Sequence, residues 1–172
     1  MPLEPQTCIA YQRDGVVILR NLVSDEALES LRRGVAANMA SPGPWANEYT
    51  PTGAAGRFFD DYVNWNRFPE FAEVGIQGSV PNAALSLMGT STCRLFHEHV
   101  LVKEAETKEV TPWHHDDPYY GIDGMDNVSI WIPLDPIPDS VALRFIAGSH
   151  NPHHRRSRDG ADTTPSTGPD SA

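Results

Sequence analysis

The segment TPWHHDDPYY, residues 111–120, carries the strongest fold signal in this chain. His114 and Asp116 stand two positions apart in a segment that predicts a β-strand, where such side chains point to the same face. One imidazole and one carboxylate would then converge on a single point. They are two of the three ligands in the two-histidine, one-carboxylate arrangement that holds non-haem Fe(II). His115 and Asp117 have the same spacing, so the sequence predicts a metal site but leaves a second register open.

The segments around this motif predict helices first and strands later. Ser24 is placed to cap a helix over residues 25–39, with acidic residues in its first turn. Residues 69–74 and 81–88 each open with proline and predict two short helices, and residues 41–56 predict a loop. Apolar and β-branched runs predict strands within residues 11–22 (after a turn at Asp14-Gly15), 93–103, 113–116, 128–134 and 141–146. The expected class is α+β, mainly β with N-terminal helices.

Composition limits the partners and the compartment. The formal net charge of −10 argues against nucleic acid and anionic membrane surfaces as partners. Cys8 and Cys93 are too few for a disulfide framework and predict reduced thiols in a cytoplasmic protein. No apolar run is long enough to span a bilayer, and no signal-peptide pattern is visible. We therefore expect a cytoplasmic protein with a small-molecule substrate, whose oligomeric state the sequence does not indicate.

The amino-acid composition of the chain changes after Asn151. Residues 152–172 contain no Val, Ile, Leu, Met or aromatic residue. Such a segment buries too little apolar surface to offset the entropy lost on ordering. The sequence predicts a folded domain over residues 1–151 and a disordered polar tail over residues 152–172.

Three blocks together resemble the phytanoyl-CoA dioxygenase family of Fe(II)- and 2-oxoglutarate-dependent oxygenases. They are Asp14-Gly15-Val16-Val17 before the capped helix, Trp113 to Tyr120, and Trp131-Ile132-Pro133-Leu134 leading to Gly148-Ser149-His150. The resemblance covers residues 8–151 and implies a double-stranded β-helix, a jelly roll with helices packed on one side.

The resemblance also implies roles for individual residues. His114 and Asp116 match the iron ligands, and His97 and His99 occupy the strand that lies near 2-oxoglutarate in the family. Trp131 matches a tryptophan close to the same co-substrate. The implied reaction is hydroxylation of an unactivated C–H bond in a small organic substrate. Asp116 favours hydroxylation over halogenation, because related halogenases carry a small residue there that makes room for chloride.

The third ligand is where this chain departs from the family. Family members carry a second iron-binding histidine on a late strand, followed by an arginine that binds the 2-oxoglutarate carboxylate in a bidentate manner. Here the chain runs from His150 into residues 151–156, Asn-Pro-His-His-Arg-Arg, and then into the polar tail. We therefore expect an incomplete jelly roll, as in a truncated or frame-shifted product. His150, His153 and His154 are the candidates for the third ligand.

Two alternatives stay open. The chain would be an inactive fragment or a non-catalytic metal-binding remnant if no third ligand reaches His114 and Asp116. Alternatively, His97 and His99, with Glu104 five residues later, follow part of the metal-binding pattern of cupins. That pattern predicts a different metal enzyme, with a His-His-Glu site.

Overall fold

The computed structural model describes residues 2–122, 124 and 126–151, which divide into two compact units. The first unit contains residues 20–137 together with Pro2. The second contains residues 3–19 and, of the described chain, residues 138–151. Each unit has its own set of contacts, so the two are described separately. None of the helices in the described part has the length and apolar character needed to cross a bilayer.

The longest helix of the first unit is α2, Asp25–Ala40. The Ser24 hydroxyl accepts a hydrogen bond from the backbone N–H of Ala27 at 3.3 Å, which satisfies one of the unpaired donors at the helix start. Asp25 and Glu26 stand in the first turn, where the helix dipole favours acidic side chains. The predicted helix and its cap are confirmed.

Two short helices follow later in this unit. Helix α3, Pro69–Ala72, continues into a π-helical turn at Glu73–Gln77, and α4 spans Ser79–Met88. Gly89 ends α4 in the left-handed region, with φ of 67°. Both predicted helices are confirmed, although α4 begins two residues before its proline.

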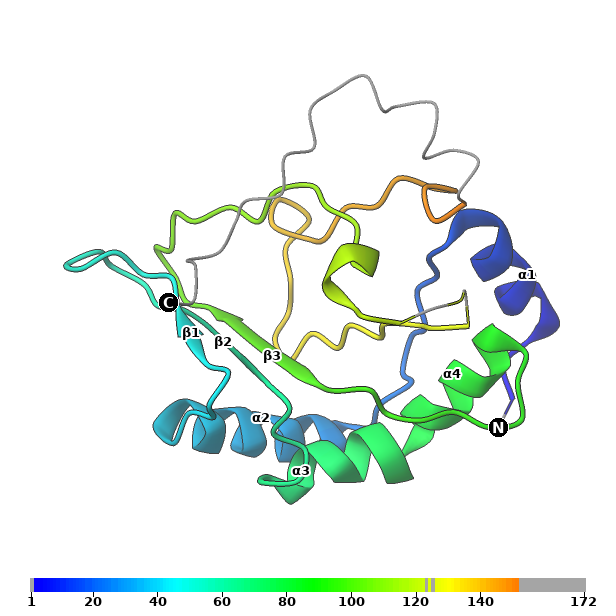
Figure 1. Cartoon of the computed structure of the whole chain (residues 1–172), viewed down its shortest axis with the longest axis horizontal. Helices are drawn as coiled ribbons and strands as arrows, with labels where there is room; N and C mark the ends of the chain where they lie inside the picture. The colour runs from blue at the N-terminus through cyan, green and yellow to red at the C-terminus, as the bar shows by residue number, and fades with distance from the viewer. Residues whose placement is uncertain (1, 123, 125, 152–172) are drawn as a thin grey trace. The chain divides into compact units, whose positions relative to one another are not determined.

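The sheet of the first unit has three antiparallel strands in the order β1-β2-β3 (Figure 1). They are Asn47–Glu48 (β1), Phe58–Tyr62 (β2) and His99–Lys103 (β3). The central strand β2 was not predicted, and β1 lies within the expected loop. Strand β3 forms only the second half of the strand expected at residues 93–103.

Alternation along β2 gives the sheet two different faces. Phe59 and Val100 point toward the helices, where the buried core consists of Leu31, Phe59, Phe71, Val74 and Val100. Helices α2, α3 and α4 lie together on that side of the sheet in Figure 1. Burying each of these side chains contributes about 1.5–3 kcal/mol. The opposite face carries Asp60 and Tyr62 of β2, beside His99 of β3, and this open face positions the candidate site.

Four predicted strands do not form in the described structure. Residues 16–22, 113–116, 128–134 and 141–146 are turns or irregular extended chain. A β-strand needs a neighbouring strand whose N–H and C=O groups pair with its own, and strand propensity alone does not supply that partner. Helices with a small antiparallel sheet agree with the α+β class. The jelly roll stays a prediction.

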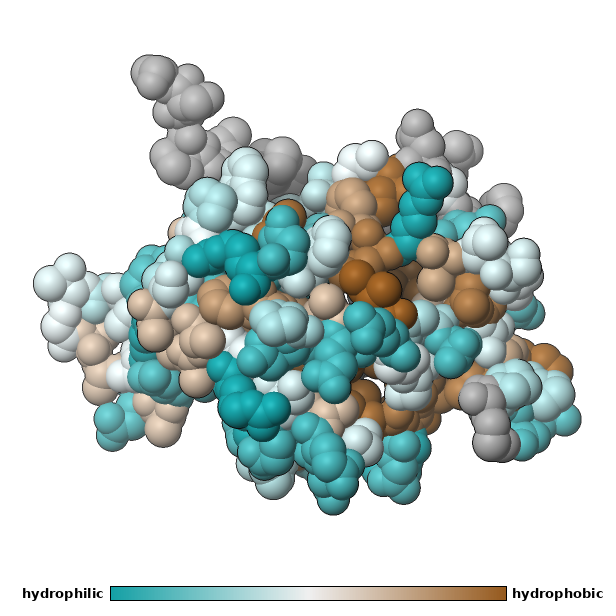
Figure 2. Space-filling model, turned by 90° about the horizontal axis from the view of Figure 1, so that it is seen from below, coloured by the Kyte–Doolittle hydropathy of each residue, from teal (hydrophilic) through white to brown (hydrophobic). Residues whose placement is uncertain are grey.

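Large apolar side chains of the unpaired segments reach the surface. Among them, Ile18 is 73%, Trp113 68% and Phe145 61% exposed. Figure 2 shows hydrophobic residues at the surface in several places between hydrophilic ones. Such exposure follows from the missing strand pairing, because an extended segment outside a sheet has no second layer of structure packed against its side chains.

In the second unit, helix α1, Pro5–Asp14, ends at Gly15 with φ of 77°. Gly148 donates its backbone N–H to the Asp14 carbonyl at 2.8 Å. The His150 ring packs so closely on Gly15 that an added Cβ would lie 2.3 Å from its Nδ1. The Asp-Gly and Gly-Ser-His blocks, far apart in the sequence, therefore pack against each other. Helix α1 was not expected, and the predicted tail lies outside the described residues.

Candidate metal and co-substrate site

His114 and Asp116 lie together, as the sequence predicts, but on a different local structure. His114 Nε2 is 3.3 Å from Asp116 Oδ1, and the two side chains are 42% and 47% exposed. They precede a short 3₁₀ helix, Asp117–Tyr119, and the Tyr119 backbone N–H donates to the Asp116 carbonyl at 2.9 Å. A turn, and not the alternation of a paired strand, therefore brings the imidazole and the carboxylate together.

The backbone carbonyl of Pro112 orients the His114 ring. His114 Nδ1 lies 2.8 Å from this oxygen, and because a carbonyl only accepts, Nδ1 carries the hydrogen. In a neutral imidazole, Nε2 then directs a lone pair at the Asp116 carboxylate, and the two lone pairs repel unless a proton or a cation lies between them. Histidines that bind metals commonly donate the other ring N–H in this way. The pair therefore fits two ligand positions of a divalent metal.

A third ligand is not found in the part of the chain that the structure describes, where no group of three or more His, Cys, Asp or Glu could hold a metal. His150 belongs to the second unit and donates through Nε2 to the Gln12 carbonyl at 3.2 Å. His153 and His154 lie outside the described residues. The alternative register of His115 with Asp117 stays a prediction, since the Asp117 side chain is outside the described part as well.

Two tyrosines connect the motif to its surroundings. The Tyr119 ring meets His114 edge to face at 6.1 Å between centroids, and the Tyr120 ring meets His97 in the same way at 5.6 Å. Burial raises the pKa of Tyr120, and the nearby charge of Asp116 adds to the rise. The tyrosines therefore link the His114–Asp116 pair to His97, a predicted co-substrate residue.

His97 and His99 both lie next to one aromatic ring. The Tyr62 ring centroid is 5.8 Å from that of His97 and 5.3 Å from that of His99. Within the described residues, the buried Nδ1 of His97 has no hydrogen-bond partner. An unsatisfied buried polar atom costs about 1–3 kcal/mol, so a ligand atom that bonds to it would be favoured. His97 Nδ1 is therefore a buried polar position to which no described group bonds, and a role in ligand binding stays a prediction.

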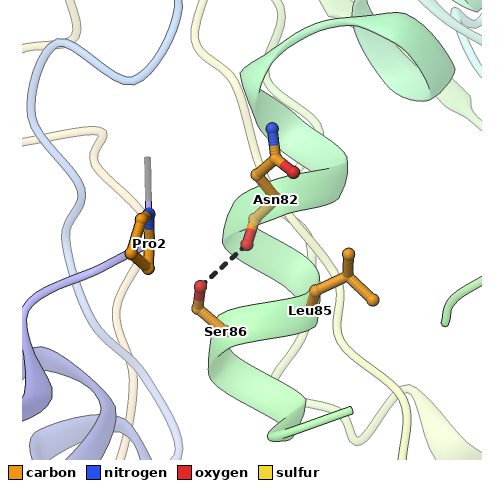
Figure 3. A pocket seen from close by; sticks show the side chains of 4 residues that line it. All are labelled: Pro2, Asn82, Leu85 and Ser86. Carbon is orange, nitrogen blue, oxygen red and sulfur yellow. Dashed lines mark hydrogen bonds between the residues drawn. The ribbon is translucent and has the colours of Figure 1, made fainter. Parts of the chain in front are cut away.

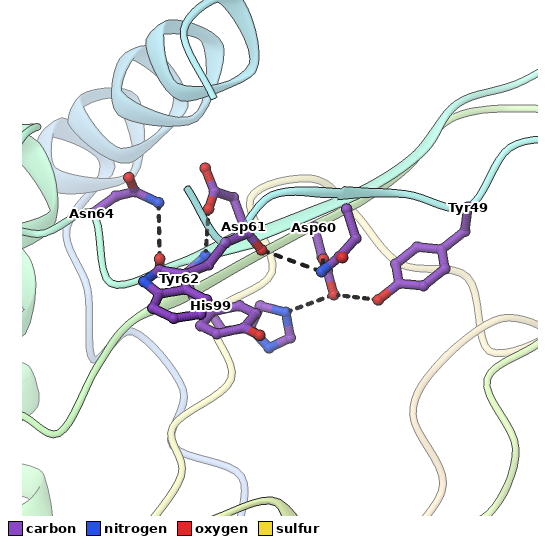
Figure 4. A network of polar contacts seen from close by, with 8 residues as sticks. Tyr49, Asp60, Asp61, Tyr62, Asn64 and His99 are labelled. Carbon is purple, nitrogen blue, oxygen red and sulfur yellow. Dashed lines mark hydrogen bonds and ion pairs between the residues drawn. The ribbon is translucent and has the colours of Figure 1, made fainter. Parts of the chain in front are cut away.

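His99 is held by a buried carboxylate (Figure 4). Asp60, only 6% exposed, accepts at Oδ2 from the Tyr49 hydroxyl at 3.1 Å and lies 3.2 Å from His99 Nε2. Its other oxygen accepts from the Asn47 side-chain amide at 2.9 Å. Burial and then the Asp60 charge raise the pKa of Tyr49 to about 12. Donors from β3 and from the β1 side of the sheet thus surround this one carboxylate on the open face.

The neighbouring Asp61 points to the opposite face and is fully buried. It accepts from the Asn38 amide of α2 at 2.8 Å, from the Gly43 N–H at 2.6 Å and from the Tyr62 N–H at 2.9 Å. Burial alone would raise the pKa of Asp61, but these hydrogen bonds outweigh it, so the pKa is lowered. Asp61 therefore anchors β2 to α2 and holds Asp60 and Tyr62 on the other face.

Sequence reasoning missed both aspartates. A signal was nevertheless present in the run Phe58-Phe59-Asp60-Asp61-Tyr62, since aspartate is depleted in strands and two of them between aromatic residues need a local explanation. The explanation is that each carboxylate is satisfied by donors on its own face of the sheet.

The remaining predicted residues do not join these groups. Glu104 accepts from the Arg57 backbone N–H at 3.0 Å, and it forms no metal-binding group with His97 and His99 within the described chain. The cupin-type alternative is therefore not favoured. Trp131 is 52% exposed, and among the described aromatic residues no ring contact joins it to either histidine.

Two surface hollows lie away from these residues. One of about 290 Å³ borders α4 and is lined by Pro2, Asn82, Leu85 and Ser86, with the Ser86 hydroxyl donating to the Asn82 carbonyl at 2.9 Å (Figure 3). The other, of about 530 Å³, lies between the start of α2 and the π-helical turn. Neither is lined by a candidate site residue.

Comparison with known proteins gives one family. The phytanoyl-CoA dioxygenase (PhyH) family matches residues 11–170, which is most of the chain. Neither a curated protein nor a solved structure gives a significant match. The three sequence blocks and the His114–Asp116 pair lie within the matched range.

Proposed function

Because this chain belongs to the phytanoyl-CoA dioxygenase family, we propose that it is an Fe(II)- and 2-oxoglutarate-dependent dioxygenase. Family membership supports the oxidoreductase class. The proposed reaction is hydroxylation of an unactivated C–H bond in a small organic substrate. The observation that carries the proposal is the His114–Asp116 pair, 3.3 Å apart, with the histidine tautomer set by Pro112.

In this proposal His114 Nε2 and the Asp116 carboxylate hold the metal. The iron, when bound, supplies the redox chemistry that couples oxidation of 2-oxoglutarate to hydroxylation of the substrate. The Pro112 carbonyl keeps the His114 ring oriented, and the Tyr119 ring contacts it edge to face. Position 116 carries an aspartate and not the small side chain that makes room for chloride in related halogenases, so hydroxylation is favoured over halogenation.

The proposed 2-oxoglutarate-binding residues are His97, His99 and Trp131. The buried Nδ1 of His97 supports the first, and the position of His99 on the open face of the sheet supports the second. Trp131 is proposed from the family resemblance alone. The net charge of −10 supports a small-molecule partner over nucleic acid, and the proposed cytoplasmic location is based on the low cysteine content of the sequence alone.

The test is an anaerobic titration of the purified chain with Fe(II) and 2-oxoglutarate, following the visible metal-to-ligand charge-transfer band. We expect a saturable band that His114→Ala abolishes and that His115→Ala, the control for the alternative register, retains. Succinate release under oxygen would then report turnover. A folded wild-type chain that gives no band, or a band that survives His114→Ala, would overturn the proposed site.

A second candidate function stays open. Within the described residues only two metal ligands converge, as a non-catalytic metal-binding protein would have them. Such a protein would bind Fe(II) weakly through His114 and Asp116 but would release no succinate. The same titration, followed by the succinate assay, separates the two functions.

A further inference from the structure

The open face of the sheet gathers aromatic rings at one end. Tyr62 stands directly opposite His99 in the β2–β3 register, and Asp60 lies two residues earlier on the same face. The Trp45 ring stacks on Tyr62 with centroids 6.4 Å apart and planes 13° apart. Trp45 is 55% exposed, so it presents an apolar ring next to Tyr62, and the Tyr62 ring in turn meets the His99 imidazole edge to face at 5.3 Å.

Asp60 sets the tautomer of His99. A carboxylate only accepts hydrogen bonds, so His99 Nε2, 3.2 Å from Asp60 Oδ2, carries the hydrogen in the neutral ring. The Nδ1 lone pair is then the acceptor that the ring presents. The Tyr49 hydroxyl and the Asn47 amide fix the carboxylate from the β1 side, so it cannot turn away from His99.

A buried carboxylate behind a partly exposed imidazole is a known way to hold the ring in one tautomer and orientation. The His99 side chain is 41% exposed and that of Asp60 is 8% exposed, so a ligand can reach the first but not the second. Asp60 therefore acts on a ligand only through His99.

We propose that His99 Nδ1 accepts a hydrogen bond from an O–H or N–H group of the substrate, with Asp60 as its positioning residue; the 2-oxoglutarate contact proposed for His97 and His99 then falls to His97. The apolar part of that substrate lies against the Trp45–Tyr62 pair. The inference rests on the proposed function for the reaction, and it narrows the substrate class to small organic molecules that carry a donor beside an apolar group.

The first measurement uses nitrogen-15 NMR of the imidazole rings in the full chain, without iron or 2-oxoglutarate. We expect His99 to be protonated at Nε2, with a proton signal kept visible by the bond to Asp60; His99→Gln assigns the signal. Asp60→Asn should weaken it, whereas Asp139→Asn, an exposed control, should not. A hydrogen on Nδ1 in the wild-type chain would overturn the inference, even if Asp60→Asn fails to fold.

The second measurement titrates 2-phenylethanol into the same sample, with 2-phenylethyl methyl ether as the donor-free control. One neutral hydrogen bond corresponds to about a three- to ten-fold difference in affinity, so the alcohol should shift the His99 signals at correspondingly lower concentration. His99→Gln should remove the difference. Equal effects of the two compounds, or no saturable shift with the alcohol, would overturn the inference. Because this titration contains no iron, a negative result would count against the role of His99 and would not change the outcome of the charge-transfer test of the proposed function.

Discussion

Substituting Gly15 with alanine tests the contact between the Asp-Gly and Gly-Ser-His blocks. Gly15 caps α1 with φ of 77°, and a Cβ there would lie 2.3 Å from His150 Nδ1 and 2.6 Å from its Cγ. These are ring atoms close to the backbone, so the imidazole has to move as a whole. The movement would disturb its hydrogen bond to the Gln12 carbonyl.

Gly89 provides a matched control, because it caps α4 in the same way. Its φ is 67°, its N–H bonds four residues back to Leu85, and nothing lies within 4 Å of an added Cβ. Gly89→Ala should therefore cost only the left-handed backbone, about 1 kcal/mol. Gly15→Ala adds the forced displacement of His150, about 1–3 kcal/mol, for a total of about 2–4 kcal/mol.

The assay is urea unfolding followed by circular dichroism, together with amide hydrogen exchange of residues 5–19. We expect Gly15→Ala to lower the free energy of unfolding clearly more than Gly89→Ala and to speed exchange in α1. His150→Ala should relieve part of this excess in the double variant, as a positive coupling. Equal costs for the two glycine variants, or no relief by His150→Ala, would refute the proposed contact.

Three further predictions follow from hydrogen bonds in the first unit. The pKa of Asp61 is lowered, so its ionised form stabilises the fold at pH values above the unfolded pKa of about 3.9. This stability is lost as the pH falls through the folded pKa, so the free energy of unfolding should decrease when the pH is lowered below about 4. Asp61→Asn should flatten this pH dependence. For Tyr49, the raised pKa contributes stability that is present below about pH 10 and lost as pH rises through about 12; ultraviolet titration should show this late phenol ionisation, and Tyr49→Phe should remove it. Ser24→Ala should cost about 1 kcal/mol in urea unfolding, whereas Ser24→Asp, which keeps an acceptor for Ala27, should cost little.

The helices of the first unit were predictable because their signals are local. Ser24 and the acidic turn after it identify the start of α2, and Pro69 identifies the start of α3. Helix α1 also opens with a proline, Pro5, and ends at Gly15, but no side chain caps its start and none of its residues is buried, so no apolar face indicated a helix there. Strand β2 was not predicted for another reason. Each face of the strand carries both an aromatic residue and an aspartate, so the sequence shows no alternation of apolar and polar residues.

The site was predictable in part. The spacing of His114 and Asp116 predicted their proximity correctly, although a turn produces it, and their metal binding stays a prediction. The partners of Asp60 were beyond sequence reasoning, because Tyr49 and His99 lie 11 and 39 residues away from it and no local pattern encodes such pairs. The runs at residues 128–134 and 141–146 show the converse, since strong local propensity does not specify a partner strand.

The two-faced strand β2 also limits how this chain can vary in evolution. Asp60 and Asp61 are neighbours, yet each depends on donors on its own side of the sheet. Inserting or deleting a single residue within Phe58–Tyr62 would exchange the two faces, exposing Phe59 and turning Tyr62 toward the helices. Changes in length should therefore be confined to the connection between β1 and β2, while the strand itself tolerates substitution more readily than any shift of register.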